Sequence, residues 1–267
     1  MFDRLNSDKG EKMKRTFSKM MFGILLLTIG LSGISCSKEK SAGKAAQTPE
    51  QAKMVEEYQK GIEESKKTII AKVNGVDISM SELITEMNTV APLYIKPGQK
   101  KTPEIDAQVQ KEALDRLIYR ELALQAAVKQ GLSVPPEKID QEIKKTKADL
   151  KSEEVYKQNL AARGMTEAEL RKRFERAFLV EMITEKEVFD KVNIDPGLIR
   201  KTYEREKASY RGPSGQMSYE EAKPAIEEKL MTPLVQKRED EWVNEMKKNA
   251  KIEITLDKAA KAIQSVQ

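Results

Sequence analysis

Helix-start signals recur along almost all of this 267-residue chain and constrain its fold more than any other feature. Three of the predicted helix starts have the Ser/Thr-x-x-Glu spacing of a capping box, in which two side chains satisfy backbone donors of a first helical turn. Other starts place proline in the first turn, or Ser, Thr or Asp directly before it. The starts are Thr48-Pro49, Ser79 with Glu82, Thr102-Pro103, Pro135-Pro136, Ser152, Thr166 with Glu169, Asp195-Pro196 and Ser218 with Glu221. They predict a mainly α chain with helices near 80–94, 104–130, 136–150, 153–163, 167–191, 196–210 and 219–250.

Two short parts of the chain have the pattern of strands instead. Ile69–Val73 and Val76–Ile78 flank Asn74-Gly75, a pair that favours a type I′ hairpin turn because both central residues need a positive φ. Lys251–Leu256 alternates apolar and polar residues, and such a strand needs a partner. We therefore expect the last strand to pair with the hairpin. Arg211–Met217, which contains two glycines and a proline, is predicted to be a turn segment.

The chain has no histidine and a single cysteine, which excludes several classes of site. Without histidine there is no Ser-His-Asp or Cys-His triad, no histidine-bearing zinc site and no imidazole general base. One cysteine excludes an intramolecular disulfide and a Cys-x-x-Cys redox pair. The phosphate-binding sequences GxxxxGKS/T and GxGxxG are also absent. We expect no cofactor, no metal site and no nucleotide.

The charge pattern argues against nucleic acid as a partner. The net charge of +5 is concentrated at the start of the chain, because six of the 48 basic residues and three of the 43 acidic residues precede residue 37. The rest of the chain is nearly neutral, and its opposite charges are interspersed. Nucleic-acid binding needs a basic stripe or patch, which this pattern does not form.

The first 36 residues have the features of a secretory signal. Basic residues precede the uncharged apolar run Met20–Leu31, which is shorter than the ~20 residues that a membrane-spanning helix needs. A basic head, a short apolar run and small residues before a break are typical of a signal peptide. Met13 is the first methionine with a well-formed signal directly behind it, so translation from Met13 instead of Met1 would give a conventional signal.

The end of this segment, Leu31–Cys36, resembles the bacterial lipobox, in which a peptidase cuts before a cysteine that then carries lipid. The small residue Ser35 fits that motif, and Cys36 is predicted to be the lipid attachment site. Ser37 after the cysteine implies the periplasmic face of an outer membrane in a host with two membranes. The alternatives are an ordinary secretory signal with an incidental cysteine, or an uncleaved anchor.

Beyond the signal we expect three regions. Residues 37–67 are a tether that ends either in a spacer helix or in a disordered linker. Residues 68–256 form a single domain, which the last helix and strand at 218–256 complete. Residues 257–267 are a tail.

Five segments resemble, in the same order, the N-terminal domain of SurA- and PrsA-type chaperones. They are Ala71–Ser79, Leu114–Leu122, Leu160–Leu170, Ile199–Glu204 and the stretch from Ser218 through Trp242 to Ile254. The resemblance implies an elongated helical fold, related to the peptide-binding C-terminal part of trigger factor, with a small β element. In this chain the N-terminal hairpin and the C-terminal strand would form that element.

Most members of the family carry one or two parvulin domains between the positions of Tyr210 and Ser218. In this chain only Arg211–Met217 fill that gap. Parvulins use paired histidines at their catalytic centre, and the chain has none. We therefore expect that the chain lacks the prolyl isomerase module and is not an enzyme.

The apolar end of the first predicted helix of the domain is the candidate surface for binding unfolded clients. Its residues precede the Pro97-Gly98 break, and flexible methionines suit variable partners. The candidates are Met80, Met87, Val90, Leu93, Tyr94 and Ile95. The alternative is that these side chains belong to the core, since most apolar helix faces are buried.

Two functions remain open from the sequence. The first is an ATP-independent, lipid-anchored holdase outside the cytoplasm that binds unfolded exported polypeptides, outer-membrane proteins among them. The second is an adaptor or assembly-factor lipoprotein with one dedicated protein partner.

Overall fold

The computed structural model describes three ranges of the chain, and the fold is discussed for these alone: 49–96, 98–213 and 215–256. The signal, Cys36, the tether before residue 49 and the tail at 257–267 lie outside the described residues, so the predictions for them stay predictions. Across the described ranges the chain is mainly helical, as predicted. No helix in these ranges is both long enough and apolar enough to span a membrane.

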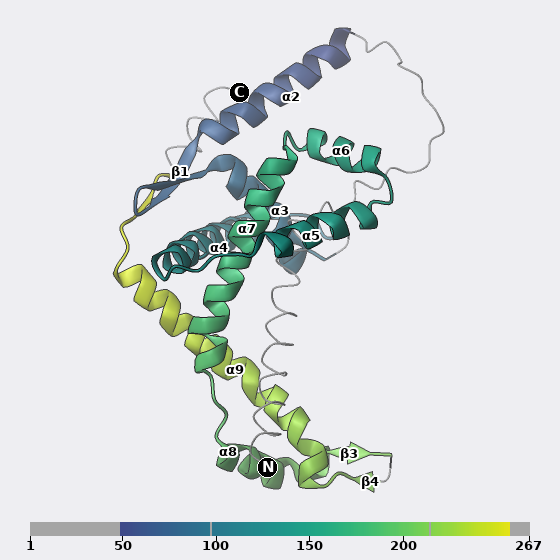
Figure 1. Ribbon diagram of the computed structural model, residues 1–267, viewed down its shortest axis with the longest axis vertical. Coiled ribbons are helices and arrows are strands. Elements are labelled where there is room, and N and C mark those ends of the chain that lie inside the picture. Colours follow the sequence, from purple (N-terminus) through teal and green to yellow (C-terminus); the bar gives the residue numbers. More distant parts are fainter. Residues whose placement is uncertain (1–48, 97, 214, 257–267) are drawn as a thin grey trace. The chain divides into compact units, whose positions relative to one another are not determined.

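The described elements are shown in Figure 1. In chain order they are α2 (Pro49–Lys67), β1 (Ile69–Val73), β2 (Val76–Ser79), α3 (Met80–Tyr94), α4 (Pro103–Lys129), α5 (Pro136–Asp149), α6 (Glu153–Ala162), α7 (Glu167–Glu187), η1 (Phe189–Lys191), α8 (Pro196–Glu206), η2 (Lys207–Ser209), β3 (Arg211–Gly212), β4 (Gly215–Gln216), α9 (Tyr219–Lys248) and β5 (Ile252–Ile254). Their contacts define two compact units. The first contains the described residues 49–125 and 247–256, and the second contains residues 126–246.

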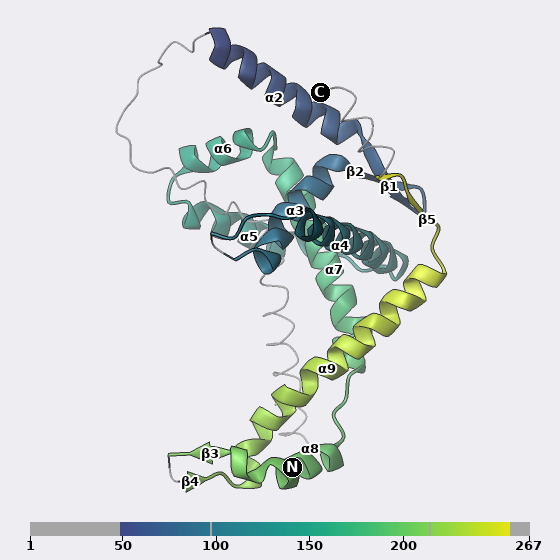
Figure 2. The same cartoon turned by 180° about the vertical axis from the view of Figure 1, so that it is seen from behind.

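The first unit is built on a three-stranded antiparallel sheet of order β2–β1–β5, whose strands lie side by side in Figure 2. Val73 on the central strand faces Val76 across the hairpin and Ile252 across the other edge. The turn residues Asn74 and Gly75 have φ of 51° and 85°, which confirms the predicted positive-φ turn. The predicted pairing of the last strand with the hairpin is also confirmed.

The side chain of Asn74 joins three parts of this unit. The Lys251 N–H donates to Asn74 Oδ1 at 2.8 Å, and Asn74 Nδ2 donates to Gln125 Oε1 at 2.8 Å. Gln125 Nε2 in turn donates to the carbonyl of Val73 at 3.1 Å. The hairpin turn, α4 and the start of β5 are therefore connected by one short chain of hydrogen bonds.

The core of the first unit lies between the sheet and the helices α3 and α4. Three of the five β1 side chains are fully buried, although the strand carries one exposed lysine. Apolar residues from α3 and α4 complete this core. The buried residues include Ile70, Ala71, Val73, Ile78, Leu83, Val90, Val109, Ala113, Leu117 and Ile118.

The second unit has its own core, to which α7 contributes most. The predicted capping box starts α7, because Thr166 Oγ1 accepts from the Glu169 N–H and the Thr166 N–H donates to the Glu169 carboxylate. The helix ends at Glu187, and not near residue 191 as predicted, because a 3₁₀ turn (η1) follows it. That tighter turn accompanies the burial of Phe189 and Val192.

The segment predicted as a turn is a small hairpin. Arg211 pairs with Gln216 and Gly212 with Gly215, so β3 and β4 each have two residues. The helix before it, α8, ends at Glu206 instead of near residue 210, and η2 covers the difference. Strands of two residues are too short to show the alternation by which a strand is recognised in a sequence.

We predict that Asn74→Ala lowers the free energy of unfolding by about 1–3 kcal/mol. The change removes the two side-chain hydrogen bonds and places alanine at a positive φ. Urea denaturation followed by circular dichroism measures the effect. Asn88→Ala on the exposed face of α3 is the control and should change stability by less than about 0.5 kcal/mol. Equal effects of the two substitutions would contradict the role of Asn74.

Candidate functional site

The candidate site is built on α3, which begins directly at the end of β2. Ser79 caps the helix: its hydroxyl accepts from the Glu82 N–H at 3.3 Å, and its N–H donates to the Glu82 carboxylate at 2.8 Å. No loop separates the strand from the helix. The position of α3 is therefore coupled directly to the sheet.

A nearly buried ion pair holds α3 against α4. Arg120 Nη2 donates to Glu86 Oε2 at 2.6 Å, and the Glu86 side chain is only 7% exposed. Leu83 and Val90 lie one turn away on either side of Glu86 and are fully buried. This face of α3 is therefore committed to the interior.

The six residues predicted from the sequence to contact clients have different positions. Met80 and Val90 are buried in the core, so the structure leaves them no surface to offer a partner. Met87 and Ile95 are half-buried. Leu93 and Tyr94 are 67% and 38% exposed, which is high for large apolar side chains.

Ile84, 46% exposed, is a further exposed apolar residue of α3 that the sequence prediction left out. The signal that could have found it is helical spacing. Ile84, Met87, Ala91 and Ile95 follow one another at intervals of three or four residues, which places them along one face of the helix.

The chain turns sharply after α3. The Ile95 N–H still donates to the Ala91 carbonyl at 2.9 Å, but Ile95 itself has an extended backbone with φ −118° and ψ 114°. The Gln99 N–H then donates to the Lys96 carbonyl at 3.0 Å, and the Lys96 N–H donates to Gln99 Oε1 at 3.2 Å. Three exposed lysines, Lys96, Lys100 and Lys101, follow the apolar end of the helix.

A second candidate region is the place where Arg211–Met217 occupy the expected position of a parvulin domain. The hairpin β3–β4 packs there against a separate group of apolar residues, which we call the hairpin cluster. Its buried members are Ile199, Tyr203, Ala222 and Ile226, and its half-buried members are Ile194, Tyr210, Met217, Tyr219 and Leu230.

Aromatic contacts and one hydrogen bond close the hairpin cluster. The ring of Tyr203 lies edge-on to Tyr219, with centroids 5.6 Å apart, and is stacked with Tyr210 at 6.3 Å. Tyr203 also donates its hydroxyl to the Met217 carbonyl at 2.8 Å. The end of α8, the hairpin and the start of α9 are therefore joined through a core of their own.

Glu206 is the most strongly perturbed carboxylate of this region. It accepts from Lys229 Nζ at 2.6 Å, from Arg205 Nη2 at 2.9 Å and from the Tyr210 hydroxyl at 3.0 Å. These three donors stabilise the charged form and hold the pKa of Glu206 at about 2.

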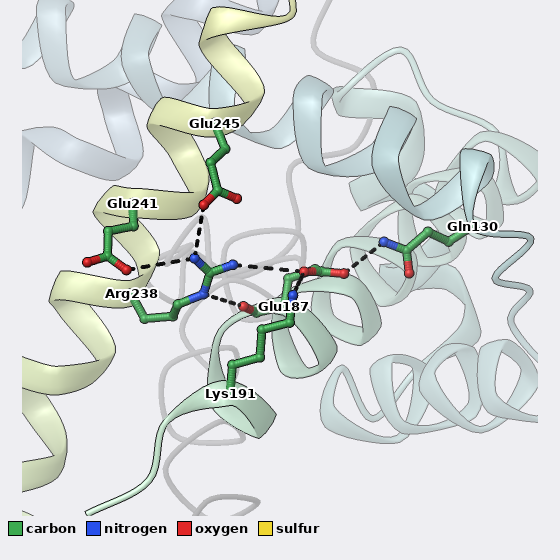
Figure 3. Close-up of polar contacts among 6 residues, drawn as sticks. All are labelled: Gln130, Glu187, Lys191, Arg238, Glu241 and Glu245. Carbon is green, nitrogen blue, oxygen red and sulfur yellow. Dashed lines mark hydrogen bonds and ion pairs between the residues drawn. The ribbon is translucent and has the colours of Figure 1, made fainter.

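A third polar group surrounds Arg238 on α9 (Figure 3). Its Nε donates to the Glu187 carbonyl at the end of α7 at 2.9 Å, and its guanidinium lies 3.9 Å from the Glu187 carboxylate. Glu245 and Glu241 approach the same guanidinium at 3.4 and 3.8 Å. Arg238 therefore joins α9 to the last carbonyl of α7 and lies among three acidic side chains.

Burial by itself would raise the pKa of Glu187, but its partners outweigh this effect. Lys191 and Gln130 donate to its carboxylate, and the charges of Lys191 and Arg238 add to them, so the pKa lies below its ordinary value. All of these groups are engaged in holding helices together, which is a structural role.

In the ranges 49–96, 98–213 and 215–256, the Cys, Asp and Glu side chains form no group of three or more that could hold a metal ion. The features that remain for function are the exposed apolar side chains of α3 and the lysines next to them. An exposed apolar patch rimmed by polar residues is typical of a site that binds another macromolecule.

Comparison with known proteins gives a family and eight similar chains among solved structures. The profile of the SurA-like N-terminal domain matches residues 8–184, which is more than half of the chain. The virulence factor PEB4 and the periplasmic protein Cj1289 are two structurally related SurA-like chaperones of the human pathogen Campylobacter jejuni. A solved chain from the structural study of these two proteins is similar to this chain. The sequence identity is 14% and the TM-score is 0.43, and the match covers 70% of this chain and 99% of that chain. No curated protein sequence matches.

We predict that Glu206→Gln makes the thermal midpoint less dependent on pH between pH 4.5 and pH 2. Because the pKa is lowered in the folded state, the stabilisation is present above the ordinary carboxyl value of 4.5 and is lost as the pH falls toward about 2. Thermal midpoints measured by circular dichroism between pH 7 and pH 2 should therefore differ most between wild type and variant above pH 4.5. Glu204→Gln, on the exposed face of α8, is the control. Parallel curves for wild type and Glu206→Gln would contradict the assignment.

We also predict that Arg238→Leu destabilises the chain by about 2–4 kcal/mol in urea unfolding, because it leaves Glu187 and its carbonyl without their arginine partner. Lys237→Leu changes the neighbouring residue, whose side chain is 75% exposed, and should cost less than about 1 kcal/mol. A loss at position 238 no larger than that at 237 would show that the contacts in Figure 3 contribute little.

Proposed function

The chain belongs to the SurA-like N-terminal domain family, and from this premise we propose that it is an ATP-independent chaperone that holds unfolded exported polypeptides. Membership of this family supports a chaperone role in general. The observation that carries the specific proposal is the exposure of three apolar side chains of α3, Ile84 near its start and Leu93 and Tyr94 at its end, on a helix that Leu83 and Val90 fix in a core.

The proposed mechanism needs no fuel. Apolar contacts are non-directional, so a small apolar surface accepts many sequences. An unfolded segment that covers Leu93 and Tyr94 removes apolar area from water on both partners. When the client folds, its own apolar residues become buried and the contact is lost.

We propose further that the protein has no prolyl isomerase activity. The hairpin at Arg211–Gln216 and the cluster beneath it occupy the position where most family members carry a parvulin domain. The absence of histidine from the whole sequence supports the same proposal, because parvulins use paired histidines at their catalytic centre.

The proposed location is outside the cytoplasm, at the periplasmic face of an outer membrane. The apolar run Met20–Leu31 and the lipobox-like end at Cys36 support export and lipid attachment. Several acyl chains on Cys36 would hold the protein at the membrane stably, since each buried CH₂ contributes ~0.8 kcal/mol.

The alternative is an adaptor with one dedicated partner, and the small extent of the exposed apolar surface favours it. In the part of the chain that the structure describes, the large apolar side chains with substantial exposure are spread over several elements. They are Val76, Ile84, Leu93, Tyr94, Val128, Val155, Leu198 and Ile254. Only α3 holds three of them.

The test is suppression of aggregation without ATP. A denatured outer-membrane β-barrel protein is diluted into buffer with and without residues 37–267, and light scattering is recorded. We predict suppression near one-to-one, and at least a threefold higher requirement for a Leu93→Ser/Tyr94→Ser variant, because serine removes the apolar contact area. Circular dichroism checks that each protein is folded.

The matched control is Val128→Ser/Leu198→Ser, which removes two exposed apolar side chains outside α3. It should suppress scattering as wild type does. Unchanged scattering with folded wild-type protein would contradict the holdase and favour the adaptor. Equal losses in the two double variants would show that α3 has no special part in binding.

A further inference from the structure

Three lysines border the apolar end of α3, ahead of the acidic residues Glu104 and Asp106. Lys96, Lys100 and Lys101 follow Tyr94 within seven residues and are all exposed. Two residues of extended chain span at most ~7 Å, so Lys96 lies directly beside the exposed Tyr94. The hydrogen bond from the Gln99 N–H to the Lys96 carbonyl closes a turn, which keeps Lys100 close to Lys96.

Nearby acidic groups pair with only one of the three lysines in the described part of the chain. Lys101 pairs with Asp106 at 3.5 Å, whereas Lys96 and Lys100 have no acidic side chain within 4 Å among the described residues. Glu86 is already paired with Arg120 in the interior. Glu82 lies at the opposite end of α3, where it caps the helix.

We propose that the α3 surface selects unfolded segments in which an acidic side chain lies next to apolar or aromatic residues. This inference rests on the proposed function and adds a client class to it. Leu93 and Tyr94 would cover the apolar residues of the segment, and Lys96 and Lys100 would pair with its carboxylate. A segment with a basic residue in that position would instead meet like charges.

A polypeptide fits this surface better than an anionic membrane does. Apart from the acyl chains proposed at Cys36, the α3 surface would need a large apolar face in addition to its basic residues to bind a membrane stably by itself. At this end of α3 only Leu93 and Tyr94 are large, apolar and well exposed, and Ile95 is half-buried. The surface formed by these two side chains and the neighbouring lysines is about as large as a short peptide segment can cover.

The experiment compares three fluorescein-labelled peptides that share one apolar-aromatic core and differ only in two flanking residues, which are Asp, Gln or Lys. Anisotropy titrations use residues 37–267 at low salt. We expect the Asp peptide to bind about two- to tenfold more tightly than the Gln peptide, and the Lys peptide to bind most weakly. The preference should disappear at 0.5 M salt, where charges are screened within a few ångströms.

Variants assign the preference to particular residues. Lys96→Gln/Lys100→Gln should bind all three peptides equally, with the affinity that wild type has for the Gln peptide. Lys144→Gln/Lys157→Gln removes two exposed lysines from α5 and α6 and should keep the wild-type preference. The Lys144→Gln/Lys157→Gln control leaves the whole α3 surface in place, so its scattering suppression should equal that of wild type.

Equal affinities of wild type for the three peptides would overturn this inference and leave the proposed function standing. Failure to bind any peptide, together with no suppression of scattering, would overturn the proposed function. Vesicles of phosphatidylglycerol and phosphatidylethanolamine are the third probe. Binding to them that depends on Lys96 and Lys100, without any peptide preference, would assign the surface to lipid and overturn the inference.

Discussion

The first unit depends on the pairing of β1 with β5, which brings together residues about 180 positions apart. A two-stranded hairpin is only marginally stable alone, and β1 would be an edge strand without β5. With β5 in place, Ile70, Ala71 and Val73 are fully buried. The helix α3 continues directly from β2, so its placement depends on the same sheet. The surface proposed for clients is therefore only as well ordered as this three-stranded sheet.

The α3 helix shows how one element combines core and surface. Its ion pair with α4 desolvates Glu86, and a buried ion pair is weak evidence for stability, since the desolvation penalty offsets much of the attraction. Its effect is on specificity, because Glu86 has its charge compensated only when α3 lies in one register against Arg120. That register keeps Leu83 and Val90 inside and leaves Ile84 and Leu93 outside. Exposed apolar side chains then stay available for binding.

Local signals made most of the fold predictable, and long-range contacts account for what was missed. The capping boxes at Ser79, Thr166 and Ser218 act within four residues, so the sequence alone places those helix starts. The Asn74-Gly75 turn is equally local. Which side of α3 is buried depends on α4, more than thirty residues away, so the sequence alone left open whether Met80 and Val90 face clients or lie in the core, where the structure has them. The β3–β4 hairpin was missed because its strands have two residues each.

The free energies of apolar burial and of client folding explain how the proposed surface could release a client without ATP. Full burial of one large apolar side chain contributes about 1.5–3 kcal/mol, so Leu93 and Tyr94 together offer only a few kcal/mol before the ordering of the client is subtracted. Contacts of this size correspond to weak and rapidly reversible binding. Folding of a client domain is worth about 5–15 kcal/mol. The folded client is therefore favoured over the bound unfolded one. In our proposal, lysines at the border would change which segments stay longest, without making release unfavourable.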